Sequence, residues 1–217
     1  MYGTVHTSPF HPERSGPGIV VLAVSKGGLE ALTSVLSALP EQFPAPLVVV
    51  RHASPEYPSL MPELLRRETG LEVAEAADGG LPRPGTVHLA PSGRHLTVSR
   101  EGEFHLSDGP KQQFVRPSAD VLCRSVAEVY GERALAAVLT GKGADGAAGA
   151  REIKASGGLV LAQEPTECEA PDMPRAALDT GCVDYTLPLR KIPSALISLT
   201  MVPWASCLLS GRAYLAA

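Results

Sequence analysis

Three side chains of this sequence are of the kinds that act together in nucleophilic catalysis. Ser25 lies in the segment AVSKGG, His52 in VVVRHASP and Asp145 in VLTGKGADGAAG. In such a set the serine hydroxyl attacks a carbonyl carbon, a neutral imidazole accepts its proton near pH 7, and a carboxylate orients the imidazole. These residue types predict hydrolysis of an ester or an amide through a Ser-His-Asp triad.

Each of these residues also has a simpler explanation. Serine is a leading N-cap residue, so Ser25 is also explained as the cap of the helix predicted after Gly27. A histidine after a strand is often an ordinary loop residue, and a carboxylate at the position of Asp145 stabilises a helix N-terminus. The glycine-rich turn around Lys142 could hold a phosphate, but the pattern G-x-x-x-x-G-K-[ST] is absent from the sequence.

Short apolar runs alternate with helical patterns along the chain, which indicates a parallel sheet covered on both faces. Strands are predicted at residues 18–24, 46–51, 134–140, 158–163 and 183–186, and helices at 28–39, 59–68, 118–130, 145–155, 173–180 and 190–201. Three further short strands at 87–90, 95–100 and 103–107, separated by the turn signals Ser92-Gly93 and Glu101-Gly102, predict an antiparallel hairpin insertion.

The predicted fold class is therefore α/β, a doubly wound, mostly parallel sheet with helices on both faces and a small antiparallel hairpin insertion. Ligands bind outside the carboxyl ends of the strands in such folds. Ser25, His52 and Asp145 each follow a predicted strand, so we expect them to meet at that edge. This coincidence favours the catalytic interpretation over three separate simple ones.

Composition limits the class of protein. The chain has 217 residues, of which 44% are hydrophobic and 19% charged, as in a globular domain rather than a disordered one. A net charge of −4 without a long basic run argues against nucleic-acid binding. The apolar runs are too short for membrane insertion, and four scattered cysteines without a C-x-x-C pair indicate reduced thiols in a cytoplasmic protein. No metal-binding motif stands out.

Residues 1–17 are expected to form a flexible tail, residues 18–200 the catalytic domain, and residues 201–217 an extension of unassigned structure.

On these residues the sequence resembles the catalytic domain of the chemotaxis-receptor protein-glutamate methylesterases, the CheB-type methylesterases. Ser25, Gly27 and Gly28 match the Ser-x-Gly-Gly turn of that family, and His52 matches the histidine that closes its second strand. LTGKGADG matches the family loop L-T-G-x-G-x-D-G, and further matches are the blocks APSGRH, RPSADVL, AQE and MPRAA. The resemblance extends over about residues 18–200.

The resemblance implies a bacterial signal-transduction enzyme that hydrolyses glutamate γ-methyl esters on chemoreceptor cytoplasmic helices and also deamidates certain glutamines. It assigns Ser25 as nucleophile, His52 as base and Asp145 as the orienting carboxylate, with Gly27 and Gly28 at the oxyanion and substrate site. No metal or other cofactor is expected. The expected partners are a methylated chemoreceptor or receptor-like protein and a response regulator in trans, without nucleic acid or membrane insertion.

The sequence also departs from the family pattern. Lys26 stands where threonine is usual, Lys142 where methionine is usual, and Asp172 where glycine is frequent. Lys26, Lys142 and Arg116 are candidates for contact with substrate. The two lysines either attract an acidic receptor segment or lower the pKa of a nearby group, and the alternative is that both point to solvent. Most family members carry an N-terminal receiver domain, so the chain is either a stand-alone esterase or a fragment. A catalytically degenerate binding module and a serine hydrolase of another ester or amide remain alternative functions.

Overall fold

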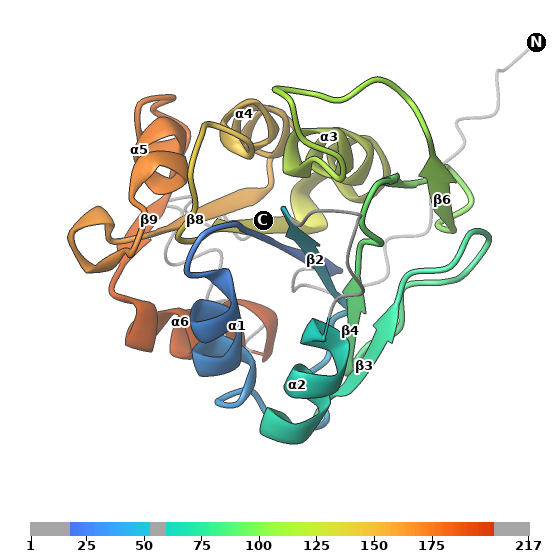
Figure 1. The fold of residues 1–217 in the computed structure, drawn as a ribbon, viewed down its shortest axis with the longest axis horizontal. Coiled ribbons are helices and arrows are strands. Elements are labelled where there is room, and N and C mark those ends of the chain that lie inside the picture. Colours follow the sequence, from blue (N-terminus) through green and yellow to red (C-terminus); the bar gives the residue numbers. More distant parts are fainter. Residues whose placement is uncertain (1–17, 53–59, 202–217) are drawn as a thin grey trace, which may run out of the picture.

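A single parallel sheet forms the centre of the protein (Figure 1). The computed structural model describes residues 18–52 and 60–201. All neighbouring strands of this sheet run parallel. In spatial order the strands are β3 (Glu72–Glu75), β4 (Thr86–Leu89), β2 (Leu47–Arg51), β1 (Ile19–Val24), β7 (Ala134–Val138), β8 (Leu159–Gln163) and β9 (Tyr185–Leu187). The chain builds outward from β1 on one side through β2 and on the other through β7, so the switch point of the fold lies between β1 and β7.

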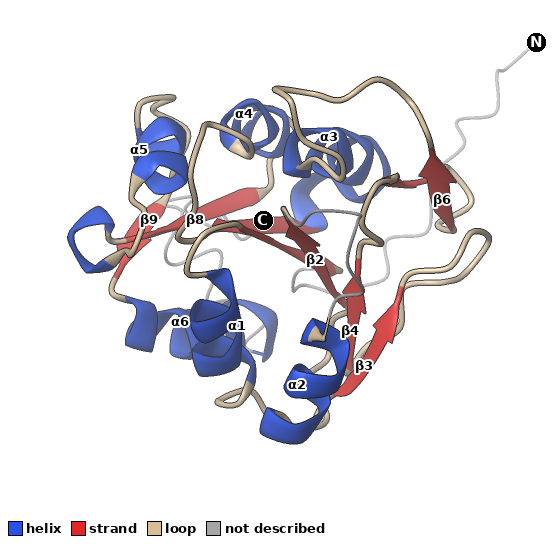
Figure 2. Cartoon of the chain, in the orientation of Figure 1, coloured by secondary structure: helices blue, strands red, loops and turns tan. Residues whose placement is uncertain are grey.

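Helices cover both faces of the sheet (Figure 2). One face packs against α1 (Gly28–Leu36), α2 (Met61–Glu68) and α6 (Ile192–Met201). The other face packs against α3 (Ala119–Tyr130), α4 (Ala147–Ala155), α5 (Asp172–Leu178) and the antiparallel pair β5 (His95–Val98) and β6 (Phe104–Ser107). Short 3-10 turns occur at η1 (Gly131–Arg133), η2 (Pro165–Glu167) and η3 (Leu189–Lys191). The predicted fold class, doubly wound α/β with a small hairpin, is confirmed.

The apolar run of β1 is explained by burial on both sides. Val20, Leu22 and Val24 belong to the core on the α1 face, whereas Val21 and Ala23 belong to the core on the α3 face. A strand that is buried on both faces needs apolar residues at every position rather than at alternate ones. The strand that delivers Ser25 to the carboxyl edge is therefore held rigidly from both sides.

Two parts of the predicted topology were wrong. Residues 87–90 were assigned to the antiparallel insertion, but β4 lies in the main sheet, parallel to β2 and β3, and the antiparallel hairpin consists of β5 and β6. The strand β3 was not predicted at all, because it is short and only Val73 is buried among its residues. Long-range parallel pairing leaves no local signal in such short segments.

Some expectations concern residues that the structure does not describe. The predicted tail at 1–17, the start of the second helix at Ser59 and nearly all of the extension at 201–217 lie outside the described residues. The last helix begins at Ile192 rather than 190, because residues 189–191 form η3. Within 18–52 and 60–201, no helix has both the length and the apolar character needed to cross a bilayer.

Candidate active site

Ser25 lies in the tight turn between β1 and α1. Its backbone N–H donates to the carbonyl oxygen of Thr140 at 3.0 Å, which ties the turn to the end of the neighbouring strand. The N-cap of α1 is Gly27, in a left-handed conformation with φ of 77°, and no side chain caps the helix. The explanation of Ser25 as a helix cap is therefore wrong, and its hydroxyl is not engaged by α1.

The loop after β7 passes directly against Ser25. A Cβ atom added to Gly141 would lie 2.8 Å from the Cβ of Ser25 and 2.1 Å from the Sδ of Met173. Only glycine allows the backbone to approach this closely. The glycine-rich loop therefore packs directly against Ser25 and continues to Asp145.

His52 follows β2 and faces the same region. Its backbone N–H donates to Val24 O at 3.3 Å, and its side-chain Nε2 lies 2.7 Å from Oδ2 of Asp145. The imidazole is mostly buried, with 12% of the side chain exposed. Ser25 and His52 both line a pocket of about 530 Å³ at the carboxyl edge of the sheet. The lining residues are Ser25, Lys26, Gly27, Gly28, Leu29, Glu30, Arg51, His52 and Glu169.

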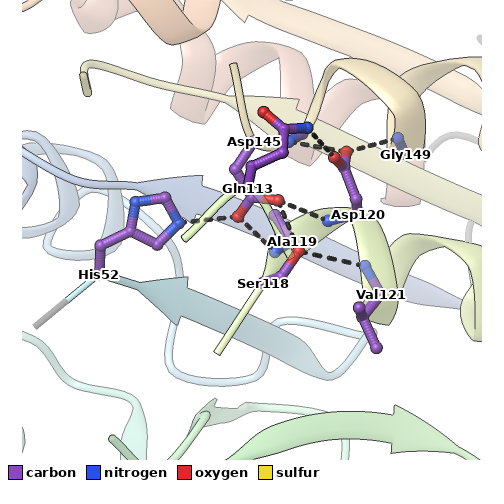
Figure 3. Close-up of polar contacts among 9 residues, drawn as sticks. His52, Gln113, Ser118, Ala119, Asp120, Val121, Asp145 and Gly149 are labelled. Atoms are coloured by element: carbon purple, nitrogen blue, oxygen red, sulfur yellow. Dashed lines mark hydrogen bonds and ion pairs between the residues drawn. The ribbon is translucent and has the colours of Figure 1, made fainter. Parts of the chain in front are cut away.

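Asp145 is held by the N-terminus of α3 (Figure 3). Its Oδ1 accepts from Ser118 Oγ at 2.6 Å and Asp120 N at 3.0 Å, and its Oδ2 accepts from Ala119 N at 2.6 Å besides contacting His52. Burial raises the pKa of Asp145, but the hydrogen bonds from His52, Ser118 and the two amides outweigh burial and lower it. The carboxylate is therefore ionised and fixed in orientation toward the imidazole.

A second buried carboxylate, Asp120, holds the helix that follows Asp145. Asp120 Oδ1 accepts from the amides of Gly146 at 2.8 Å and Gly149 at 2.7 Å, and Oδ2 accepts from Gln113 Nε2 at 2.9 Å. Burial is the largest cause that raises the pKa of Asp120, and the nearby charge of Asp145 adds to it. Each helix N-terminus thus binds an aspartate from the other helix region: Asp145, which precedes α4, binds the N-terminus of α3, and Asp120, in the first turn of α3, binds the N-terminus of α4 (Figure 3). The explanation of Asp145 as the cap of α4 is therefore wrong.

The remaining predicted substrate residues lie in different places. Lys26, Gly27 and Gly28 line the pocket, but the Gly28 amide donates to Ser25 O at 3.0 Å and is already engaged. Lys142 is exposed on the loop after β7, and Arg116 donates from Nη1 to the carbonyl oxygens of Asp108 and Gly109. Neither is among the residues that line the pocket in the described part of the chain.

Three features of the site were missed. Asp120 was not among the predicted site residues, although an acidic residue on the buried face of α3 indicates a polar contact inside the fold. Ser118 begins the segment predicted as a helix at 118–130, and its side chain caps α3 by accepting from Val121 N, but its bond to Asp145 was not predicted. Glu169 carried no sequence signal. Across the described ranges, no group of three or more His, Cys, Asp or Glu side chains could hold a metal ion.

Comparison with known proteins identifies the family. Residues 20–196 match the family model described as CheB methylesterase. The chain is 44% identical over 182 residues to protein-glutamate methylesterase/protein-glutamine glutaminase 2 of Anaeromyxobacter dehalogenans, and 41% identical over 179 residues to protein-glutamate methylesterase FrzG of Myxococcus xanthus. These matches cover 84% and 82% of this chain but 53% and 54% of the relatives, so the chain spans about half the length of those proteins.

A solved structure shows the same architecture. The CheB methylesterase catalytic domain of Thermotoga maritima superimposes with a TM-score of 0.81 at 38% identity. The alignment covers 84% of this chain and 98% of that domain. The match accounts for the parallel sheet, the helices on both faces and the antiparallel pair together.

Proposed function

Because this chain belongs to the CheB methylesterase family, we propose that it hydrolyses glutamate γ-methyl esters on chemoreceptor-like proteins through Ser25, His52 and Asp145. The observation that carries the proposal is the 2.7 Å contact between His52 and Asp145 beside the pocket that Ser25 lines. A buried carboxylate on the imidazole fixes its tautomer and stabilises the imidazolium that forms during proton transfer.

In the first half of the proposed reaction, Ser25 Oγ attacks the ester carbonyl carbon. Its proton passes to Nδ1 of His52, since Nε2 is held by Asp145. The carbonyl electron pair moves onto oxygen, and the backbone amides of Lys26 and Gly27 donate to this oxyanion, since the Ser25 amide is held by Thr140. When the tetrahedral intermediate collapses, methoxide leaves and takes the proton from His52 as methanol, and the glutamyl group stays on Ser25.

In the second half, water attacks the acyl-serine and gives its proton to His52, which returns it to Ser25 as glutamate leaves. Glutamine deamidation follows the same course with ammonia in place of methanol, and the names of several relatives pair both activities. No step calls for a metal or an organic cofactor. The proposal also includes action in the cytoplasm, a methylated receptor as substrate protein and a response regulator as partner in trans.

The test is methanol release from a purified, enzymatically methylated chemoreceptor cytoplasmic fragment. Ser25→Ala is expected to abolish release, since it removes the nucleophile, and His52→Ala to lower it by at least about a hundredfold, since it removes the general base. Ser34→Ala is the matched control, because Ser34 is an exposed serine in α1, the helix that follows the Ser25 turn. Wild-type release by Ser25→Ala would refute the assignment.

Two further outcomes separate the alternative functions. A fluorophosphonate probe that fails to label the wild-type protein indicates a binding module without an activated serine. Labelling that depends on His52, combined with no methanol release from methylated receptor, indicates a serine hydrolase of another ester or amide.

A further inference from the structure

A pair of opposite charges lines the Ser25 pocket. The Nζ of Lys26 is 3.4 Å from Oε1 of Glu169, and both residues line the pocket. About half of each side chain is exposed, at 53% and 54%. Lys26 directly follows the serine, whereas Glu169 comes from the segment between β8 and α5, so the fold brings together two distant parts of the chain.

Thr140 holds the two segments in place. Its hydroxyl donates to Lys26 O at 3.0 Å and accepts from Ala170 N at 3.0 Å. Glu169 also packs on the nucleophile turn, because a Cβ atom added to Gly27 would lie 2.8 Å from both its Cβ and its Oε2. The carboxylate therefore lies beside the turn that presents Ser25.

This arrangement bears on the difference between substrate and product, and the inference rests on the proposed function. The ester is uncharged, whereas the product glutamate is an anion. An unpaired Lys26 beside the pocket would attract that anion and delay its departure. We propose that Glu169 is a specificity-determining residue, which neutralises Lys26 and keeps the pocket selective for uncharged acyl groups over the carboxylate product.

The other charges around the pocket do not replace this effect. Glu30 and Arg51 also line it and carry opposite charges. They stay the same when Lys26 or Glu169 is changed, so their contribution cancels when variants are compared. The difference among variants therefore reports the Lys26–Glu169 pair alone.

The experiment measures two constants for each variant: KM for the methylated chemoreceptor fragment, and the inhibition constant Ki of the same fragment after alkaline demethylation. Glu169→Gln is expected to lower Ki about threefold to tenfold, and Lys26→Met to raise it by a similar factor, with smaller changes in KM. The double variant is expected to return Ki to within about twofold of wild type, because both charges are then absent. The shifts should shrink as salt is added.

Glu72→Gln is the matched control. Glu72 begins β3 at the opposite edge of the sheet, and it forms a similarly exposed pair with Arg83, with Nη2 and Oε1 2.8 Å apart. This variant removes the same charge without touching the pocket, so its Ki should match wild type.

Several results would overturn the inference. Unchanged Ki in both single variants would show that the pair does not act on the product. Equal shifts of KM and Ki would show that the loop moved and that charge selectivity is not involved. Absence of methanol release by the wild-type protein would instead overturn the proposed function, so the two failures are distinguishable.

Discussion

Replacing Asp145 by asparagine tests most directly whether this carboxylate orients and stabilises the imidazole of His52. The carboxylate accepts from Ser118 Oγ, Asp120 N, Ala119 N and His52 Nε2, two donors on each oxygen. Asparagine keeps one accepting oxygen and turns the other into a donor. We expect the retained oxygen to face Ala119 and His52, since the amide group can then donate to the hydroxyl of Ser118, which is free to rotate.

In that orientation the N–H of Asp120 loses its acceptor. A buried N–H without a partner costs about 1–3 kcal/mol, and the remaining bonds lose the assistance of the negative charge. Because the pKa of Asp145 is lowered, the folded protein favours its charged form, so loss of the charge brings no compensating gain. The free energy of unfolding of Asp145→Asn is expected to fall by roughly 2–4 kcal/mol in urea titrations.

The effect on catalysis follows from the same contact. Histidine keeps a hydrogen-bond acceptor and hence its tautomer, but the imidazolium formed during the reaction loses its opposite charge. A charge-assisted bond exceeds a neutral one by about 1–3 kcal/mol, so kcat/KM for methanol release is expected to fall roughly tenfold to a hundredfold. A larger loss of kcat/KM would indicate that the NH2 group of the new asparagine, rather than its oxygen, faces His52. Activity within threefold of wild type, in folded protein, would refute the role of Asp145.

Asp120→Asn is the control for burial and loss of charge. Its Oδ1 can still accept from Gly146 and Gly149, and its new amide faces Gln113, an exposed side chain that can turn to present its oxygen. The change is expected to alter the free energy of unfolding by less than about 1 kcal/mol and kcat/KM by less than about threefold. Equal losses in both variants would mean that neither carboxylate acts specifically on the imidazole.

Three further predictions concern the framework of the site. Gly141→Ala is expected to lower the free energy of unfolding by roughly 1–3 kcal/mol and to reduce kcat, because the new methyl would press on Ser25 and Met173; unchanged urea midpoint and kcat would contradict the packing. Phe114 has φ of 69° and is 94% exposed, so Phe114→Asn is expected to raise the free energy of unfolding by about 0.5–1 kcal/mol, and a lower melting temperature would contradict this. Since the pKa of Asp120 is raised in the fold, its ionised form opposes folding at pH 7 and this penalty disappears as pH falls through its folded pKa. The free energy of unfolding of Asp120→Asn relative to wild type should therefore decrease between pH 7 and pH 4, and a relative value that rises on acidification would contradict the assignment.

The sequence was informative wherever a local pattern determines structure. The apolar runs before Ser25 and His52 predict strands that are buried on both faces, and the glycines after Ser25 predict the tight turn. The common edge of a parallel sheet then brings the two residues to one pocket. These steps need only periodicity and turn chemistry.

The sequence was not informative where contacts between distant segments decide the outcome. Asp145 lies two residues before α4, so local reasoning assigns it to that helix, yet it binds the N-terminus of α3. When an aspartate binds the N-terminus of a different helix, no fixed residue spacing in the sequence reveals the contact. The pairing of Lys26 with Glu169 and the parallel register of β4 were hidden for the same reason.

Because Asp145 binds the N-terminus of α3 and Asp120 binds that of α4, the comparison of Asp145→Asn with Asp120→Asn distinguishes an enzyme from a binding module. In a module, both aspartates would serve only to join α3 to α4, so Asp145→Asn and Asp120→Asn would affect stability but not the reactivity of Ser25. In a hydrolase, the rate of fluorophosphonate labelling, corrected for the folded fraction, should fall with Asp145→Asn and stay near wild type with Asp120→Asn. The contrast needs no knowledge of the receptor, because it depends only on which carboxylate contacts the imidazole.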